Sequence, residues 1–444
     1  MDIINRKKRL TSFQIIILGF ASTILIGTFF LMLPISSKNG NATSFMDALF
    51  TATSAVCVTG LVVKDTATYW SIFGQMMILI LIQIGGLGVI TVAASVALIS
   101  GRKISLMQRS TMQEAIAAPK VGGIVRLLGF VLKITFFLEC LGAIVMMPVF
   151  LKDFGVKGIW MSIFHSVSAF CNAGFDILGT DASQYVSFTN YTANPIINIT
   201  IMLLIVIGGI GFLTWDDIYM HKFHFKKYRM QSKVILTTTA LLIVVPTVFF
   251  FFIDFNHYPL EKRILASLFQ AITPRTAGFN TVDLTLLSGA GQIIIIALML
   301  IGGSPGSTAG GMKTTTLAVL FANARSSFYR KEDAQLFNRR IEVKTIKNAA
   351  TIILMYIILF YVSGIAISIL ESLPIGICLF ETASAIGTVG LTLGITPSLH
   401  LMSKIILIVL MFFGRVGGLT LIYAAISGSS KHISKLPQER ITVG

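Results

Sequence analysis

Long stretches without a charged residue constrain this chain more than any other feature of its sequence. Such stretches run through residues 13–33, 76–99, 196–212 and 352–370. A bilayer core about 30 Å thick needs roughly 20 apolar residues in one helix, so these stretches have the length of membrane spans. Charged residues make up only 12% of the chain, against about 25% in soluble domains. We therefore predict an all-α membrane protein.

Basic residues give the chain a formal net charge of +16, and most of them lie in five short segments. These segments are residues 6–9, 102–126, 222–233, 325–347 and 431–440. The positive-inside rule predicts that all five lie in the cytoplasm, together with both termini of a protein of the cell membrane. No aromatic RNA-binding signature accompanies them, so we expect contact with membrane lipids and none with nucleic acid.

The basic segments divide the chain into four blocks, residues 1–100, 101–220, 221–325 and 326–444. Each block contains a long apolar helix, then a short apolar segment ending in a glycine-bearing loop, then a second long helix. Because the basic connections fall between blocks, both ends of each block face the cytoplasm. The short segment must then enter the membrane and return to the same side. We predict eight spans and four re-entrant pore helices, arranged as four parallel repeats around one pore.

A phenylalanine and a glycine mark the short segment of every block, with a spacing that agrees within one residue. The loops that end in this glycine are Val58-Thr59-Gly60, Asn172-Ala173-Gly174, Thr276-Ala277-Gly278 and Thr388-Val389-Gly390. Backbone carbonyls aimed at a common axis can replace the water around a cation. Glycine permits the backbone conformations that aim them, and the C-terminal end of the short helix favours positive charge. We predict a cation filter made of these four loops.

A second glycine-rich motif follows each loop, and the third of these motifs is unlike the others. It reads Gly302, Gly303, Ser304, Pro305, Gly306, Ser307, Thr308, Ala309, Gly310, Gly311, Met312, Lys313. So many glycines around a proline cannot remain helical. We call this segment the 302–313 loop. It is expected just below the filter, near the bilayer centre, where it would obstruct the path, and we predict that it is the gate.

The order of phenylalanine, short helix, glycine loop and glycine-rich second helix resembles the Trk/Ktr/HKT superfamily of K⁺ transporters over essentially the whole chain. The resemblance implies the K⁺-translocating subunit of a potassium uptake system, with K⁺ held at Gly60, Gly174, Gly278 and Gly390 and gated by the 302–313 loop. It also implies a homodimer and a separate cytosolic ring of nucleotide-binding regulatory subunits, with no nucleotide bound on this chain. Four glycines favour K⁺ over Na⁺, and Na⁺ as an activating ion is left open.

Three charged residues inside the apolar blocks are candidates for a role in the pore. Arg415 stands in the last glycine motif, where a charge costs about 2.5 to 3.5 kcal/mol on insertion scales. We expect it to act as an electrostatic barrier or a brace for the gate, with a purely structural contact to carbonyls elsewhere as the alternative. The resemblance also implies a basic residue at this place. Glu381 and Arg275 are expected to hold the filter from behind.

Three aspartates, Asp65, Asp176 and Asp283, follow the loop glycines at short distances. They could raise the local cation concentration at the outer mouth of a pore. The alternative is that they are ordinary solvated loop acids, and the sequence favours neither interpretation.

A secondary transporter that couples another solute or cation to Na⁺ or H⁺ is the main alternative function. It would have inverted repeats and ionisable residues at the membrane midplane, whereas these blocks are parallel and contain few buried carboxylates. A membrane enzyme is the third class, and the chain offers no paired catalytic residues for it. Flux of Rb⁺ or K⁺ into liposomes would distinguish the three classes.

Overall fold

The computed structural model describes residues 11–99, 105–116, 122–222 and 224–425, together with residues 437 and 439. The basic residues of segments 6–9 and 431–440 lie outside the described residues, and so do the two termini that were expected in the cytoplasm.

The described chain is almost entirely helical. Its helices and strands are α1 (Ser12–Met32), α2 (Phe45–Val56), α3 (Thr66–Tyr69), α4 (Ile72–Leu87), α5 (Val89–Ile99), α6 (Leu106–Ile116), α7 (Ile124–Phe154), α8 (Lys157–Phe170), α9 (Pro195–Gly209), α10 (Phe212–His221), α11 (Met230–Phe249), α12 (Leu260–Ile272), α13 (Gly289–Leu300), α14 (Thr314–Phe328), β1 (Gln335–Leu336), β2 (Arg339–Arg340), α15 (Val343–Glu371), α16 (Ile375–Gly387), α17 (Leu401–Val416) and α18 (Gly418–Ala425). Short 3₁₀ turns occupy Pro34–Ser36, Thr189–Tyr191, Phe225–Lys227, Leu284–Leu286 and Thr396–Ser398, and a π-helical turn, Phe250–Asp254, continues α11.

Four helices in the described ranges are long and apolar enough to cross a membrane on their own. They are α1, α7, α11 with its π-helical turn, and α15, which begin the four predicted repeats. Only 22% to 33% of their most apolar windows is buried inside the protein, so most of this apolar surface is available to lipid. The chain is therefore a multi-pass membrane protein.

The second helix is broken at its glycine motif in every repeat, which corrects the expectation that only the third repeat is interrupted. The axes of α4 and α5 bend by 98° at Gly88, and those of α9 and α10 bend by 98° beside Gly211. Gly417 separates α17 from α18. These three glycines have φ values of 87°, 92° and 89°, which side chains rarely permit. The described part of the structure thus has four continuous spanning helices, and the helix predicted after each loop is interrupted.

The four short helices expected to re-enter the membrane are α2, α8, α12 and α16. Three of them end against a glycine in the second helix of their own repeat, at distances that leave no room for a side chain. The separations between a Cβ built on that glycine and the nearest helix-end carbonyl oxygen are 2.0 Å for Gly85 and Val56, 2.1 Å for Gly208 and Phe170, and 2.2 Å for Gly414 and Ile386. The glycine motifs therefore allow close packing in addition to bending the helix.

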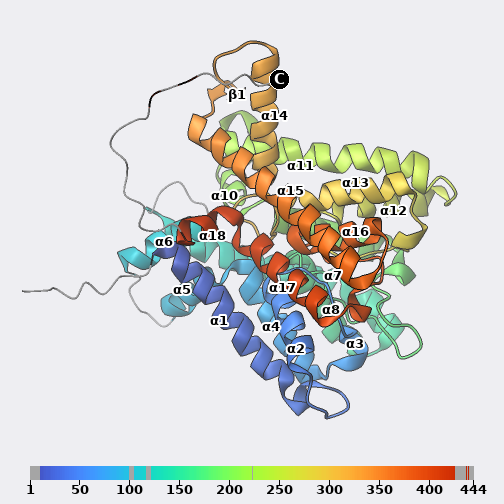
Figure 1. Ribbon diagram of the computed structural model, residues 1–444. Coiled ribbons are helices and arrows are strands. Elements are labelled where there is room, and N and C mark those ends of the chain that lie inside the picture. Colours follow the sequence, from blue (N-terminus) through green and yellow to red (C-terminus); the bar gives the residue numbers. More distant parts are fainter. Residues whose placement is uncertain are drawn as a thin grey trace, which may run out of the picture.

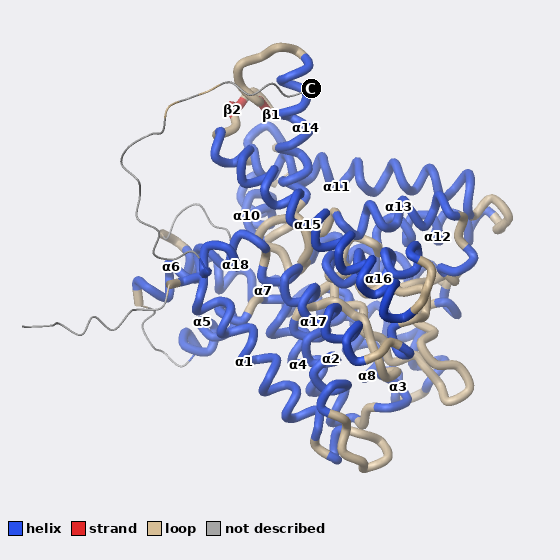
Figure 2. The backbone as a smooth tube through the Cα atoms, in the orientation of Figure 1, coloured by secondary structure: helices blue, strands red, loops and turns tan. Residues whose placement is uncertain are grey.

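Contacts between successive repeats close the four repeats into a ring. The second helix of each repeat packs against the short helix of the next: α4 against α8, α9 against α12, α13 against α16, and α17 against α2. The last pair joins the fourth repeat back to the first. Figure 1 shows the segments of all four repeats packed into one bundle, and Figure 2 shows loop backbone among the helices in its middle.

A small hairpin between α14 and α15 is the one departure from the all-α class in the described residues. Strands β1 and β2 pair antiparallel, and Phe337 and Asn338 between them have φ values of 47° and 59°. A two-residue hairpin turn of type I′ needs positive φ at both positions, and these two residues provide it. The hairpin projects beside α14 at the top of Figure 1.

Candidate functional site: a ring of four loops and the segment that contacts it

The four loop glycines lie in direct contact and form a closed ring, which we call the glycine ring. Each glycine faces a backbone carbonyl oxygen of the next repeat, which belongs to the residue immediately before that repeat's own ring glycine. The distances from a built Cβ to that oxygen are 2.5 Å for Gly60 and Ala173, 2.6 Å for Gly174 and Ala277, 2.2 Å for Gly278 and Val389, and 2.2 Å for Gly390 and Thr59. Four loops that are far apart in the sequence therefore meet around one axis, and no side chain fits at any of the four positions.

Backbone strain recurs at one place in every loop. The residue two positions before each ring glycine has a left-handed conformation, with φ values of 55° at Val58, 57° at Asn172, 76° at Thr276 and 51° at Thr388. This conformation costs roughly 1 to 2 kcal/mol for a residue with a Cβ. Strain of this kind persists where the surrounding structure imposes it, and it clusters at functional sites. Its fourfold recurrence indicates that the loops share one constrained geometry.

A hydroxyl side chain near the end of each short helix supports the loop from behind, which our sequence analysis missed. The hydrogen-bonded pairs are Ser54 Oγ with the Gly60 N–H (3.0 Å), Ser384 Oγ with the Gly390 N–H (3.0 Å), the Ser168 hydroxyl with the Phe175 carbonyl (2.8 Å), and the Thr273 hydroxyl with the Phe279 carbonyl. In the first, second and fourth blocks a Ser stands six residues before the ring glycine, and in the third block a Thr stands five residues before it, so an alignment that allowed a shift of one residue would have revealed this position.

A cavity of about 120 Å³ adjoins the glycine ring and is lined by all four of its glycines. Asp65 and Asp176 line this cavity, whereas Asp283 does not. The Asp65 carboxylate is occupied by the backbone N–H groups of Thr68 and Tyr185, both at 2.8 Å. Asp65 therefore caps backbone N–H groups, and for Asp176 the predicted role at the mouth stays a prediction.

The 302–313 loop contacts the inner ends of the second and fourth loops. Thr308 Oγ1 accepts a hydrogen bond from Asn172 Nδ2 at 3.2 Å and donates one to the last carbonyl of α8 at 3.0 Å. A Cβ built on Gly310 would lie 2.2 Å from Thr388 Oγ1. The predicted gate and the predicted filter are thus in direct contact, and the short side chains of the 302–313 loop make that contact possible.

The same loop is held by the glycine motifs and by its own side chains. The Ser304 N–H donates to the Gly209 carbonyl at 3.0 Å, and the Gly311 N–H donates to the Gly414 carbonyl at 3.0 Å. Further bonds within the loop join Lys313 Nζ to the carbonyls of Ala309 (2.9 Å) and Gly310 (3.3 Å), Ser307 Oγ to the Ser304 carbonyl (2.7 Å), and the Gly303 N–H to the Gly310 carbonyl (3.3 Å). Gly302 packs on Gly310 and Gly311, and Gly211 packs on the carbonyls of Pro305 and Gly306.

Arg415 joins three repeats through its guanidinium group. It donates hydrogen bonds to the carbonyl of Thr308 in the 302–313 loop and to the carbonyls of Gly85 and Gly86 in the first repeat, the last at 3.0 Å. Within the described part of the chain it forms no ion pair with a carboxylate. This geometry matches a brace for the loop, one of the two functions considered for Arg415.

Glu381 and Arg275 lie behind the loops, as expected. Glu381 is fully buried, and its carboxylate accepts hydrogen bonds from the hydroxyls of Thr392 (2.8 Å) and Thr396. It therefore ties α16 to the segment that leaves the fourth loop. Arg275 donates to Thr239 Oγ1 of α11 at 3.5 Å, which connects the third loop to a spanning helix.

A buried carboxylate that our sequence analysis did not single out lies behind the second loop. Glu139 of α7 is 7% exposed and accepts a hydrogen bond from Gln83 Nε2 at 3.3 Å. Cys171 Sγ, at the start of the second loop, lies 3.5 Å from Gln83 Oε1. An acidic residue inside a spanning helix is a functional candidate by default. The position of Glu139 in a long apolar stretch could therefore have identified it from the sequence alone.

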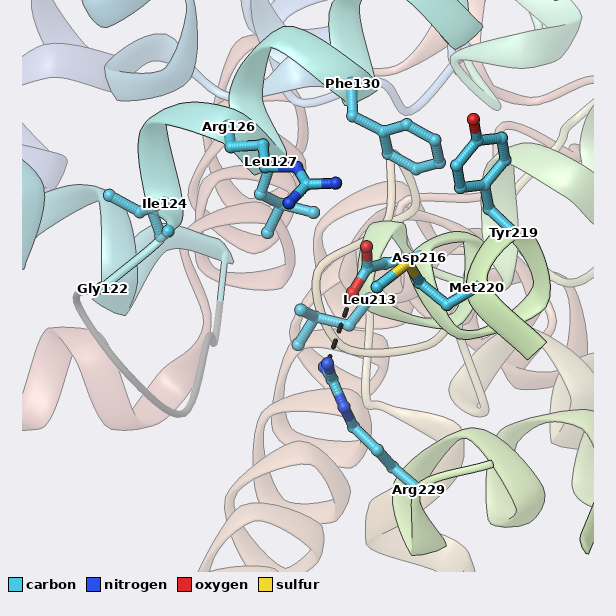
Figure 3. A pocket seen from close by; sticks show the side chains of 11 residues that line it. Gly122, Ile124, Arg126, Leu127, Phe130, Leu213, Asp216, Tyr219, Met220 and Arg229 are labelled. Carbon is cyan, nitrogen blue, oxygen red and sulfur yellow. Dashed lines mark hydrogen bonds and ion pairs between the residues drawn. The ribbon is translucent and has the colours of Figure 1, made fainter. Parts of the chain in front are cut away.

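Another cavity, of about 440 Å³, lies where α7 begins and α10 passes it (Figure 3). Arg126 and Asp216 point into it, and Arg229 pairs with Asp216 at 3.3 Å. The rings of Phe130 and Tyr219 face each other with centroids 5.2 Å apart. No predicted filter or gate residue lines this cavity, so we assign it no part in the ion path.

Comparison with known proteins places the chain in a family. The model of the TrkH family, described as a cation transport protein, matches residues 6–435. The potassium/sodium uptake protein NtpJ of Enterococcus hirae is 40% identical, over 99% of this chain and 98% of that protein. The Ktr system potassium uptake protein B of Bacillus subtilis is 36% identical, over 94% of this chain and 93% of that protein.

The fold is shared with a solved structure. The crystal structure of the potassium transporter TrkH from Vibrio parahaemolyticus superposes with a TM-score of 0.74 and 19% identity, covering 96% of this chain and 87% of that one. The ring of repeats and its central loops define a multi-pass membrane transport protein. The chain belongs to the TrkH family of cation transport proteins, which confirms the resemblance seen in its four loops and makes it a transporter, not an enzyme.

Proposed function

We propose that this chain is the K⁺-translocating subunit of a potassium uptake system and that K⁺ passes through the glycine ring. The observation that carries this proposal is the mutual contact of Gly60, Gly174, Gly278 and Gly390, each against a carbonyl of the next repeat. The names of the relatives, potassium/sodium uptake protein and potassium uptake protein, agree with it.

The loops would act by replacing water around the ion. A cation that leaves water without compensation loses a solvation energy of tens of kcal/mol. Carbonyl oxygens from the loops, residues 58–60, 172–174, 276–278 and 388–390, would supply that compensation. The hydroxyls behind the loops and the buried Glu381 carboxylate would keep the ring rigid, which is what discrimination between K⁺ and Na⁺ requires of a filter of fixed size.

The 302–313 loop would be the gate, held closed in this structure. Its bonds to Asn172, Gly209, Gly414 and Arg415 support that role, because they place the segment against the inner ends of the loops. Opening would require these bonds to break together. The loop is therefore suited to two discrete positions rather than gradual motion.

The arrangement in the cell is also part of the proposal. Each interrupted second helix would complete a crossing, which gives eight crossings with both termini in the cytoplasm. Two copies would form a homodimer with one pore each, regulated by a cytosolic ring of nucleotide-binding subunits. The relative named as protein B of a Ktr system supports a partner subunit, and Na⁺ would act as a transported or activating ion rather than as a resident cofactor.

A carrier coupled to Na⁺ or H⁺ is the second candidate, and Glu139 is the observation that favours it. A carboxylate buried at membrane depth is the kind of group that takes part in coupled transport. A pH or Na⁺ gradient without a K⁺ gradient would then drive Rb⁺ uptake, whereas a pore would show no such uptake.

The direct experiment is Rb⁺ uptake into liposomes that contain the purified chain, with and without deletion of residues 306–310. We expect uptake by the intact chain and a several-fold increase after the deletion. Unchanged uptake in a deletion variant that elutes as the intact protein does would refute the gate, and the absence of uptake by both would refute the transport function.

A further inference from the structure

The cavity of about 440 Å³ between the start of α7 and the end of α10 lies at the level of the lipid headgroups. Helix α7 is continuous, and Arg126 and Lys152 stand near its two ends. At a rise of about 1.5 Å per residue they lie roughly 39 Å apart along the helix, and a bilayer with its headgroups is about 40 to 45 Å thick. Both residues are exposed. Arg126, which lines the cavity, therefore reaches the headgroups of one leaflet, and Lys152 reaches those of the other.

The deeper side of the cavity is aromatic and faces outward. Phe130 stands one turn further along α7 than Arg126, and its ring lies against that of Tyr219 in α10, with centroids 5.2 Å apart (Figure 3). Tyr219 is 67% exposed, and its neighbour Met220 is 58% exposed. Large exposed apolar side chains on a membrane protein contact lipid, and tyrosine is enriched where the hydrocarbon meets the headgroups. The cavity is therefore open toward the acyl chains on this side.

The shallow side of the cavity presents hydrogen-bond donors without partners. Arg126 points into the cavity and forms no hydrogen bond or ion pair with any described residue (Figure 3). Helix α7 has Gly123 as its N-cap, which offers no side chain to cap the first N–H groups. A Cβ built on Gly122 or Gly123 would meet nothing within 4 Å, so these N–H groups are open to a ligand. A helix N-terminus and an arginine side chain both bind phosphate oxygens.

The charges that line the cavity, two arginines and one carboxylate, leave one positive charge in excess. Asp216 also points into the cavity, but it pairs with Arg229 at 3.3 Å, and Arg229 pairs with Asp217 as well, at 3.3 Å. Arg126 is thus the arginine of the lining whose charge is not shared. One excess charge matches a phosphodiester, which carries a single negative charge, better than a phosphate monoester, which carries about 1.5 to 2 at neutral pH.

We propose that this cavity binds the headgroup of an anionic phospholipid such as phosphatidylglycerol, with the phosphate against Arg126 and the first N–H groups of α7. The acyl chains of this lipid run along Phe130 and Tyr219. A phosphate and hydrocarbon chains on one molecule fit a cavity that has donors on its shallow side and aromatic rings on its deeper side. A free phosphate would leave the aromatic side without a partner.

The lipid also fixes the position of α10. At the start of this helix the Phe212 N–H donates to the Gly306 carbonyl of the 302–313 loop at 2.7 Å, and the cavity reaches its last turn at Tyr219 and Met220. A ligand that joins α7 to α10 therefore stabilises the position in which α10 holds the loop. This regulatory part rests on the proposed function, in which the loop is the gate, whereas the binding part does not.

Binding is measured on the full chain in detergent, from the rise in melting temperature with increasing dihexanoyl-phosphatidylglycerol. Arg126→Gln removes the free charge. Lys152→Gln is the matched control, because Lys152 is an exposed basic residue of the same helix in the other leaflet. We expect Arg126→Gln to raise the lipid concentration for half-maximal stabilisation about five- to tenfold, because charge-assisted hydrogen bonds are the strong ones, and Lys152→Gln to leave it unchanged. Asp216→Asn should lower it several-fold, because it releases part of the Arg229 charge.

Regulation is measured as Rb⁺ uptake into phosphatidylcholine liposomes with and without phosphatidylglycerol. Variant and unsubstituted chain are compared in the same liposomes, so the surface potential of the anionic lipid acts on both equally. We expect Arg126→Gln to take up Rb⁺ several-fold faster than the unsubstituted chain where phosphatidylglycerol is present, and at the same rate where it is absent. Lys152→Gln should match the unsubstituted chain in both kinds of liposome.

Equal stabilisation of Arg126→Gln and Lys152→Gln by phosphatidylglycerol would overturn the site, and so would equal stabilisation of the unsubstituted chain by dihexanoyl-phosphatidylcholine. Stabilisation by inorganic phosphate alone that depends on Arg126 would show a site for free anions and overturn the lipid. Binding that depends on Arg126 without any effect on uptake would overturn the regulatory part. If the unsubstituted chain takes up no Rb⁺ in either kind of liposome, the proposed function fails, and the measurement in detergent still decides the binding.

Discussion

Arg415, in the glycine motif of the fourth repeat, donates a hydrogen bond from its guanidinium to the backbone carbonyl of Thr308 in the 302–313 loop. The same group also binds carbonyls of the first repeat, so one side chain connects the proposed gate to the two repeats that meet last in the ring. A charged side chain that stands where other repeats have glycine is thereby explained by its partners.

Replacing this brace should release the loop. Arg415→Gln is expected to raise Rb⁺ uptake into liposomes by about tenfold, because a hydrogen bond from a charged group contributes roughly 1.5 to 3 kcal/mol. Arg325→Gln is the control, since Arg325 lies exposed on α14. Uptake that stays at the level of the unsubstituted chain in a folded Arg415→Gln protein would show that the brace does not restrain the loop.

Two glycines after α16, one in the fourth loop and one shortly after it, allow the effect of close packing to be measured apart from the effect of backbone strain. Gly390 and Gly394 have similar φ values, 96° and 94°, but a Cβ on Gly390 would lie 2.2 Å from the Thr59 carbonyl, whereas a Cβ on Gly394 meets nothing within 4 Å. Gly394→Ala should cost only the strain of about 1 to 2 kcal/mol, seen as a lower melting temperature with discrimination intact. Gly390→Ala should in addition abolish the preference for Rb⁺ over Na⁺. Equal effects of the two variants on ion preference would contradict the glycine ring.

The buried Glu381 carboxylate offers a test of rigidity behind the filter. Glu381→Gln keeps the shape of the side chain but weakens the hydrogen bonds from Thr392 and Thr396, because charged acceptors form the stronger bonds. We expect the ratio of Rb⁺ to Na⁺ uptake to fall several-fold, with a smaller fall for Thr396→Val. A ratio unaffected by both substitutions would mean that these bonds stabilise the fold without tuning the filter.

The cavity at the glycine ring predicts a pH dependence. Removal from water raises the pKa of the Asp176 carboxyl to about 7, and the nearby charge of Asp65 acts in the same direction, while the hydrogen bond from the Leu178 N–H opposes them. Asp176 is therefore negative above about pH 7 and neutral below it. Negative charge at a mouth concentrates cations, so uptake should fall several-fold as the pH at that face drops from 8 to 6.

Asp176→Asn is the control for this effect, and it should make uptake nearly independent of pH over the same range. High salt should reduce the difference between the two proteins, because screening weakens the attraction. An Asp176→Asn variant that retains the full pH dependence would assign the titration to another group.

The parts of the fold that follow from the four repeated sequence blocks could be predicted from the sequence. The four loops were identified by one phenylalanine and one glycine per block, and the structure brings Gly60, Gly174, Gly278 and Gly390 into contact. The prediction of a membrane protein followed from the uncharged stretches, because their length matches the thickness of the bilayer core that a helix must cross.

Features that depend on contacts between repeats could not be predicted in the same way. The helix breaks at Gly88, Gly211 and Gly417 depend on the sign of φ, and a glycine in a membrane helix is compatible with either sign. The partners of Arg415 are backbone carbonyls, which every residue has, so the sequence indicated that it needs a partner but not which one. The hydroxyls of Ser54, Ser168, Thr273 and Ser384 could not be predicted from their spacing alone, because Thr273 lies one residue closer to its ring glycine than the other three do.

The measurement that tests the central claim most directly is the ion preference of uptake by the purified chain in liposomes, with Na⁺ in competition with Rb⁺. We expect the unsubstituted chain to prefer Rb⁺, and we expect a change of any single member of the glycine ring to serine to lower this preference about tenfold or more in a folded protein. A chain that keeps its preference after Gly174→Ser and after Gly278→Ser would show that selection occurs elsewhere.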